Sequence, residues 1–196
     1  MNIVKQHKIG TFEVTSGALR ITDPCYDLDT WCAGTLTQAM NGSWNAYVLI
    51  SDEGDWGKRV AVLVATHKSV GDDFPDIINH YGYRDLSGKW NRTDIDVGVD
   101  SGQAGIFDLE KFPGKDDEEK QEWYQECCNV TLSRVHHAGT IEGGVVSSSG
   151  IGDGSYRCYT LLNEASEVVG VLLDFYLLDS YEDHEDDYED EEEYED

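Results

Sequence analysis

Residues 44–50 read WNAYVLI and residues 59–67 read RVAVLVATH, and these two segments decide the fold class. In the first segment every second residue, beginning with Trp44, is apolar, which predicts a strand with these side chains on one face. The second segment is apolar on both faces, as expected for a strand in the centre of a sheet. An acidic turn at residues 52–55 separates them. The sequence therefore predicts an antiparallel β-hairpin at the heart of the fold.

Further segments with the two-residue period lie on both sides of this hairpin. Residues 12–14 and 19–21 flank the break Thr15-Ser16-Gly17 and predict an opening hairpin. Additional strands are predicted at residues 95–99, 140–147, 155–162 and 168–178, the last two joined by a turn at residues 163–167.

Helical signals are few. Asp72 or Asp73 can cap a short helix that Gly82 ends, and residues 116–128 predict a second helix with an acidic first turn. Residues 82–93 are typical of a surface loop. The expected fold is α+β and β-rich, an antiparallel sheet or sandwich of about seven or eight strands with two short helices.

The negative charge of the chain falls into two parts. Residues 179–196 hold 13 of the 40 acidic residues and no Lys or Arg, and this composition predicts disorder. Residues 1–178 keep 27 acidic and 14 basic residues, a net charge of −13. We therefore expect a single β-rich globular domain over 1–178 and a disordered acidic tail over 179–196.

An acidic body limits the classes of partner. Nucleic acids and anionic membranes are bound through Lys and Arg, so we expect no direct nucleic-acid binding and no membrane association. A basic protein is the more natural large partner. No leader peptide or membrane span is predicted, and five cysteines without disulfide spacing fit a reducing compartment. The expected location is cytoplasmic.

Three polar segments are candidates for chemistry. The first, TDPCYD at residues 22–27, brings the carboxylate of Asp23, the thiol of Cys25 and the phenol of Tyr26 into one turn. A nucleophilic cysteine needs a base or a positive field, and no histidine lies nearby in the sequence. An ordinary Asp-Pro turn with a buried cysteine is the favoured interpretation.

The second segment, at residues 94–108, reads DIDVGVDSGQAGIFD. Its strand pattern places three carboxylates in line, those of Asp94, Asp96 and Asp100. They are weak candidates for a Mg²⁺ or Ca²⁺ site because the pattern of a calcium loop is missing, and a solvated strand face is favoured. Ser101 and Gln103 follow as candidates for ligand binding.

The third segment, SSSGIGDGSY at residues 147–156, is a glycine-rich loop whose N–H and hydroxyl groups can form an anion-binding nest. Its candidates are Ser148, Asp153 and Tyr156. It lacks the Lys of a Walker loop, and Asp-Gly is also a common hairpin turn, which is the favoured reading. The histidines and cysteines have no metal-ligand spacing, so no cofactor is predicted.

The motifs DSGQAGIFD (100–108) and SSGIGDGSY (148–156), preceded by ITDPCYD (21–27), resemble a family of uncharacterised bacterial and bacteriophage proteins known only as a domain of unknown function. The resemblance runs from about Gly10 to Asp174 and leaves the acidic tail outside. It implies an accessory protein of a phage or bacterium, and it supplies no catalytic residues.

These observations give competing functional hypotheses. The first is a non-enzymatic intracellular binding protein, an accessory or inhibitor protein that engages a basic protein partner or a small polar ligand. The alternative is a metal-dependent hydrolase or nucleotide-processing enzyme that uses Asp100, Asp108 and Asp153 with the 147–156 loop. Convergence of Asp100 and Asp153 in a pocket would favour the enzyme. A structural or assembly protein would instead need a large apolar interface.

Overall fold

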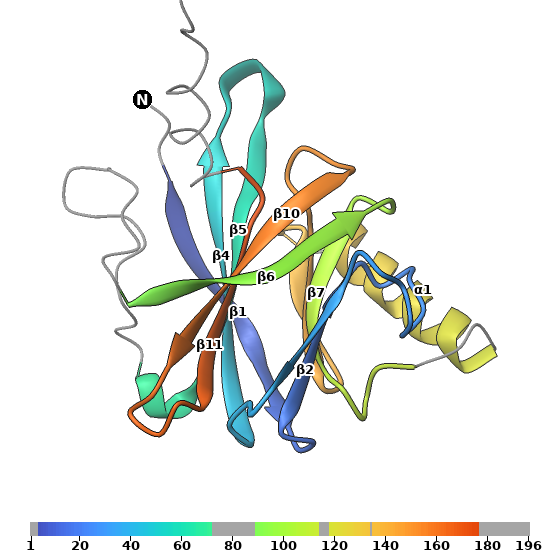
Figure 1. Cartoon of the computed structure of the whole chain (residues 1–196). Helices are drawn as coiled ribbons and strands as arrows, with labels where there is room; N and C mark the ends of the chain where they lie inside the picture. The colour runs from blue at the N-terminus through green and yellow to red at the C-terminus, as the bar shows by residue number, and fades with distance from the viewer. Residues whose placement is uncertain (1–3, 72–88, 114–117, 134, 177–196) are drawn as a thin grey trace, which may run out of the picture.

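The computed structural model describes residues 4–71, 89–113, 118–133 and 135–176, which form two antiparallel sheets and one α-helix (Figure 1). The larger sheet has six strands in the order β1 (Lys5–Val14), β4 (Gly42–Asp52), β5 (Lys58–His67), β11 (Val168–Asp174), β10 (Gly154–Leu162) and β6 (Trp90–Val99). The smaller sheet has five, in the order β3 (Gly34–Thr37), β2 (Ala18–Thr22), β7 (Gln103–Asp108), β9 (Gly144–Ser148) and β8 (Ala138–Ile141). Two 3-10 turns, η1 (Gly54–Trp56) and η2 (Lys68–Val70), flank β5. The expected β-rich α+β fold is confirmed.

The hairpin of β4 and β5 forms the centre of the larger sheet, as the sequence predicts. In β4, Trp44 and Val48 face the interior between the two sheets, while Tyr47 and Leu49 pack in a second apolar cluster on the opposite face. In β5 every residue from Val60 onwards is buried. This explains why the sequence of β5 is apolar on both faces.

The two sheets face each other across one core and also meet at their edges. At one edge β1 runs beside β8, and at the other β6 approaches β2 and β3. There Gly98 N donates to the Cys32 carbonyl at 2.8 Å. A Cβ atom at Gly34 would come within 2.4 Å of the Ile95 side chain, so only glycine allows this approach. The result is a sandwich closed along both sides.

The helix α1 (Glu118–Ser133) packs on the outer face of the smaller sheet (Figure 1). Phe107 and Val146 of the sheet contact Cys127 and Val130 of the helix. The predicted helix at residues 116–128 is confirmed, and it extends further because Val130 is also buried against the sheet. None of the helices among the described residues is both long and apolar enough to span a bilayer.

The predicted opening hairpin is wrong. Strand β1 pairs with β4, whereas β2 pairs with β3 and β7, so the two segments belong to different sheets. The chain crosses between the sheets at residues 15–17, and both strands turn their apolar sides to the same interior. The two-residue period shows which face is buried, but it does not identify the neighbouring strand.

The structure has more strands than the sequence predicts, for three reasons. Strand β3 is short and partly exposed, so it has little apolar pattern. Strand β7 was interpreted only as a motif, and the predicted strand 140–147 is a hairpin of β8 and β9. Residues 90–93, predicted as loop, begin β6. The predicted helix that starts at Asp72 or Asp73 and the predicted tail 179–196 lie outside the described residues.

Candidate functional site

Asp23 links two of the three predicted segments. Its side chain is fully buried, and Oδ2 accepts hydrogen bonds from Asp100 N at 2.9 Å and Ser101 N at 2.8 Å. Its Oδ1 accepts from Ser101 Oγ at 2.6 Å and from Cys25 N at 2.8 Å. All four donors are groups of the protein's own chain. The carboxylate therefore clamps the β6–β7 turn against the loop after β2, and this clamp is its structural role.

Cys25 and Tyr26 lie beside this clamp. The predicted buried cysteine is wrong, because Cys25 is exposed. Partial desolvation and the neighbouring Asp23 carboxylate nevertheless raise the pKa of the Cys25 thiol to about 12. Such a thiol stays protonated near neutral pH and is a poor nucleophile. Burial and a hydrogen bond to Asp100 also raise the pKa of Tyr26. The Tyr26 carbonyl accepts from Lys120 Nζ at 2.6 Å, which ties this loop to α1.

The third segment joins the same corner of the molecule. Ser149 N donates to the Gly102 carbonyl at 2.9 Å, and Ser148 is the strand partner of Gln103. The Gln103 side chain is buried, where Oε1 accepts from Thr131 Oγ1 at 3.0 Å. Its Nε2 donates to Cys128 Sγ at 3.4 Å. Gln103 thus anchors α1 to β7.

The predicted hairpin turn at Asp153-Gly154 is wrong, because β9 and β10, on either side of the glycine-rich loop, belong to different sheets. Two hydroxyl groups of this segment bond to its own backbone. The Gly152 carbonyl accepts from Ser149 Oγ at 2.6 Å and from the Tyr156 hydroxyl at 2.7 Å. Tyr156 is buried, and its ring packs edge-on against Phe175 at 5.1 Å. Tyr156 is therefore a core residue. Together with Asp23, Ser101 and Gln103, the pair Ser149 and Tyr156 forms what we call the polar corner.

The carboxylates of the alternative hypothesis do not form a metal site in the described part of the chain, where no group of three His, Cys, Asp or Glu is arranged to hold an ion. Asp94, Asp96 and Asp100 are exposed on β6 and its end, and Asp96 pairs with Arg92 at 2.8 Å. Asp153 is exposed and, like Asp100, lines none of the three cavities described below.

Asp108 is bound by the segment that crosses between the sheets. Its carboxylate accepts from the backbone of Thr15, Ser16 and Glu110 and from Thr15 Oγ1 at 3.0 Å. Burial acts to raise the pKa of Asp108, but these hydrogen bonds outweigh it and hold the pKa below its usual value. Asp108 is committed to the fold in the same way as Asp23.

A cavity of about 590 Å³ opens beside the polar corner, between α1, the β4–β5 hairpin and the β9–β10 loop. The helix contributes Tyr124, and the hairpin contributes Trp56, Lys58 and Arg59. Burial raises the pKa of the Tyr124 phenol to about 12, so the hydroxyl is a donor at neutral pH. The remaining residues that line this cavity are Ser101, Gly102, Gln103, Cys128, Thr131, Leu132, His137, Ser148, Ser149, Gly150 and Gly152.

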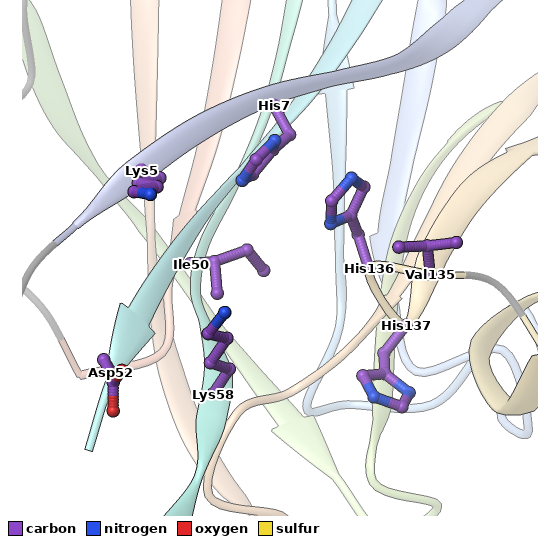
Figure 2. A pocket seen from close by; sticks show the side chains of 8 residues that line it. All are labelled: Lys5, His7, Ile50, Asp52, Lys58, Val135, His136 and His137. Carbon is purple, nitrogen blue, oxygen red and sulfur yellow. The ribbon is translucent and has the colours of Figure 1, made fainter. Parts of the chain in front are cut away.

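A second cavity, of about 610 Å³, adjoins the first through the shared residues Lys58 and His137. Figure 2 shows the imidazole rings of His7 and His136 lying side by side, with His137 pointing away from them. The two stacked rings are 4.1 Å apart at an angle of 21°. The remaining residues that line this second cavity are Lys5, Ile50, Asp52 and Val135.

We call the two cavities together the cationic cleft. Its basic side chains are those of Lys5, His7, Lys58, Arg59, His136 and His137. Asp52 is the one carboxylate among the described lining residues. A third cavity, on the other side of α1, has the opposite character, because five glutamates and Lys111 line it with Trp123.

Exposed apolar side chains also gather at the cationic cleft. Trp56 is 75% exposed, Leu132 81% and Val135 89%, and all three line it. Ile151, 61% exposed, lies in the loop that forms one wall. Exposed apolar side chains at a hollow in the surface favour a binding site there.

The sequence analysis missed most of the cleft residues. The predicted turn ends at Asp55 and the predicted strand begins at Arg59, so the sequence assigns no role to the tract between them, which places Trp56 beside Lys58. An exposed aromatic residue next to two cations in a turn was the available signal. His7 and His136 are 129 positions apart, and only the meeting of β1 with β8 brings them together.

Comparison with family models, with curated proteins and with solved structures gave no match. The resemblance to uncharacterised phage and bacterial proteins therefore stays a prediction. The geometry of the cleft carries the functional argument.

Proposed function

We propose that this protein binds a small anionic ligand in the cationic cleft. The observation that carries the proposal is the reversal of charge. The body has 27 acidic residues against 14 Lys and Arg, whereas the cleft is lined by one carboxylate, three Lys or Arg side chains and three histidines. Clefts of one sign concentrate ligands of the opposite sign. Hydroxyl groups of Tyr124 and Ser148 stand beside the cations and can donate hydrogen bonds to oxyanions.

The ligand also has a flat or apolar part. Trp56 and Tyr124 line the same cavity, and an exposed indole is a stacking surface for a planar ring. The volume of about 590 Å³ lies in the range of small-molecule pockets. A nucleotide combines a phosphate with a planar base, so it is the chemical class that these walls fit best. This develops the small polar ligand of the sequence hypothesis and needs no catalytic group.

The test is calorimetric titration with adenosine monophosphate and with inorganic phosphate at low salt. We expect both to bind, with the nucleotide tighter because its base stacks. Lys58→Gln should weaken both about 5–10-fold, the loss of one charge-assisted contact. The matched control is Lys68→Gln, because Lys68 is an exposed lysine beyond the opposite end of β5. Binding that is absent in the unaltered protein, or equally weakened by both variants, would overturn the proposal.

A further inference from the structure

The described chain ends at the wall of the cationic cleft. Phe175 N donates to the Ala61 carbonyl at 3.0 Å, which fixes the end of β11 beside β5. The ring of Tyr176 covers Gly150, where a Cβ atom would lie 2.8 Å from Tyr176 Cε1. The Gly150 carbonyl accepts from Arg59 Nη1 at 3.1 Å. Gly150 and Arg59 both line the cleft, so the chain that follows Tyr176 starts at its rim.

The sequence that follows has the charge that the cleft attracts. Residues 179–196 contain 13 Asp or Glu and no Lys or Arg. The rest of the body repels such a segment, because its net charge is −13 and one cavity beside α1 is lined by five glutamates. Among the surfaces that the structure describes, the cationic cleft combines three Lys or Arg side chains and three histidines with one carboxylate.

The distances allow this contact in the same molecule. Two residues lie between Tyr176 and Asp179, the first acidic residue of the segment. An extended chain spans about 3.3–3.6 Å per residue, so about ten residues reach across some 30 Å. The segment is thus long enough to cross both cavities. A tethered segment of this kind has an effective concentration in the millimolar range, which lets weak contacts compete with a free ligand.

We infer that the acidic segment 179–196 binds in the cationic cleft of its own chain and competes there with the anionic ligand. This inference rests on the proposed function for the competition, but the docking of the segment stands by itself. Its contacts are carboxylates on Lys5, Lys58 and the histidines. They are exposed to solvent and weaken with salt, because the screening length is about 8 Å at physiological ionic strength.

Docking is tested by cross-linking in the full chain. A carbodiimide joins carboxylates directly to lysine amines, and mass spectrometry locates the products. We expect cross-links from residues 179–196 to Lys5 and Lys58 to exceed those to Lys68 at least fivefold at low salt, and this preference to disappear in 0.5 M NaCl. An even distribution over the three lysines would overturn docking. In an equal mixture of ¹⁴N and ¹⁵N protein, binding between chains makes about half of the cross-links mixed, so a mixed fraction near that value would overturn binding within one chain.

Competition is tested by a full-length variant with every Asp→Asn and every Glu→Gln between residues 179 and 196. Adenosine monophosphate should bind it at least fivefold more tightly than the unaltered protein at low salt, and less than twofold more tightly in 0.5 M NaCl. Equal affinity of the two proteins at low salt would overturn the competition. Cross-links to Lys58 without nucleotide or phosphate binding to either protein would overturn the proposed function alone. Nucleotide binding with evenly distributed cross-links would overturn docking alone.

Discussion

The polar corner contributes Ser101, Gln103 and Ser149 to one wall of the cationic cleft, yet the corner and the rest of the cleft use their polar groups in opposite ways. In the polar corner, the Asp23 carboxylate accepts four hydrogen bonds from its own chain, and the Gly152 carbonyl accepts two. In the cleft, cations and exposed apolar groups such as Trp56 face a cavity. The difference shows that a cluster of polar residues in a sequence often serves the fold, while an adjacent and less conspicuous surface can hold the ligand.

The largest expected effect comes from a substitution that removes hydrogen bonds in the polar corner. Asp23→Asn places an amide group where backbone donors of Asp100 and Ser101 need an acceptor. We expect a loss of about 3 kcal/mol in the free energy of unfolding, measured by urea denaturation. Asp153→Asn, in the neighbouring exposed loop, is the control and should change stability by less than about 0.5 kcal/mol. Similar stability of the two variants would contradict the structural role of Asp23.

The second prediction concerns Asp108 and acid. Because its pKa is lowered in the folded state, its ionised form stabilises the fold above the unfolded pKa, and this contribution is lost as the pH falls through the folded pKa. At pH 7 we expect Asp108→Asn to lose about 2 kcal/mol. The difference from the unaltered protein should shrink below a pH of about 4. Urea denaturation at pH 7 and at acid pH measures the difference in the free energy of unfolding between the two proteins. A difference that does not change with pH would contradict a stabilising role of the ionised carboxylate.

The third prediction sharpens the description of the cleft. Trp56 is mostly exposed, so Trp56→Ala should leave the free energy of unfolding within about 0.5 kcal/mol. The same change should weaken adenosine monophosphate about tenfold, because base stacking on an aromatic ring contributes about 1–3 kcal/mol. Inorganic phosphate, which has no ring, should bind as before. Trp31→Ala provides a control, because Trp31 is 92% exposed and lines neither cavity of the cleft.

The smallest expected effect is a pH dependence at the cleft. Burial and the imidazoles of His7 and His137 hold the pKa of His136 below its usual value of 6.5. A bound anion favours the charged imidazole, so affinity should rise a few-fold between pH 8 and pH 6. The other ionisable side chains that line this pocket are those of Lys5, His7, Asp52, Lys58 and His137.

Sulfate is the suitable probe for this dependence, because its own charge does not change in that range. His136→Gln should flatten the dependence, and an unchanged slope in that variant would assign it to other groups. In the absence of ligand, the free energy of unfolding changes with pH in the opposite direction to the affinity. A histidine with a lowered pKa takes up its proton less readily in the folded state, so its contribution is complete above pH 6.5 and declines as the pH falls.

Much of the fold could be predicted because its signals are local. The apolar residues of β5 and the turn at Asn163 specify hairpins by themselves, and Asn163 Oδ1 accepts from Ala165 N and Glu167 N at 2.9 Å. The partner of β1 could not be predicted. Its alternating residues fit any neighbouring strand, and the pairing with β4 depends on contacts far apart in the sequence.

The candidate site divides in the same way. The sequence pointed to Asp23, Ser101, Gln103 and Ser148, and the structure brings their segments together. The sequence did not show that the polar groups of Asp23 and Gln103 already form hydrogen bonds within the chain. Whether a polar group forms these hydrogen bonds depends on which partners lie within about 3 Å, and tertiary packing sets that distance.

By itself, the sequence determined the strand-rich fold, a helix predicted at residues 116–128 and the separation of charge between an acidic body and residues 179–196. These depend on periodicity and composition, which are properties of short stretches of chain. Only the tertiary structure decided that Lys58, Arg59 and the histidines of β1 and the α1–β8 connection surround one cleft in an acidic protein. Net charge is a sum over residues, whereas a binding site depends on where the charges lie, and folding sets their positions.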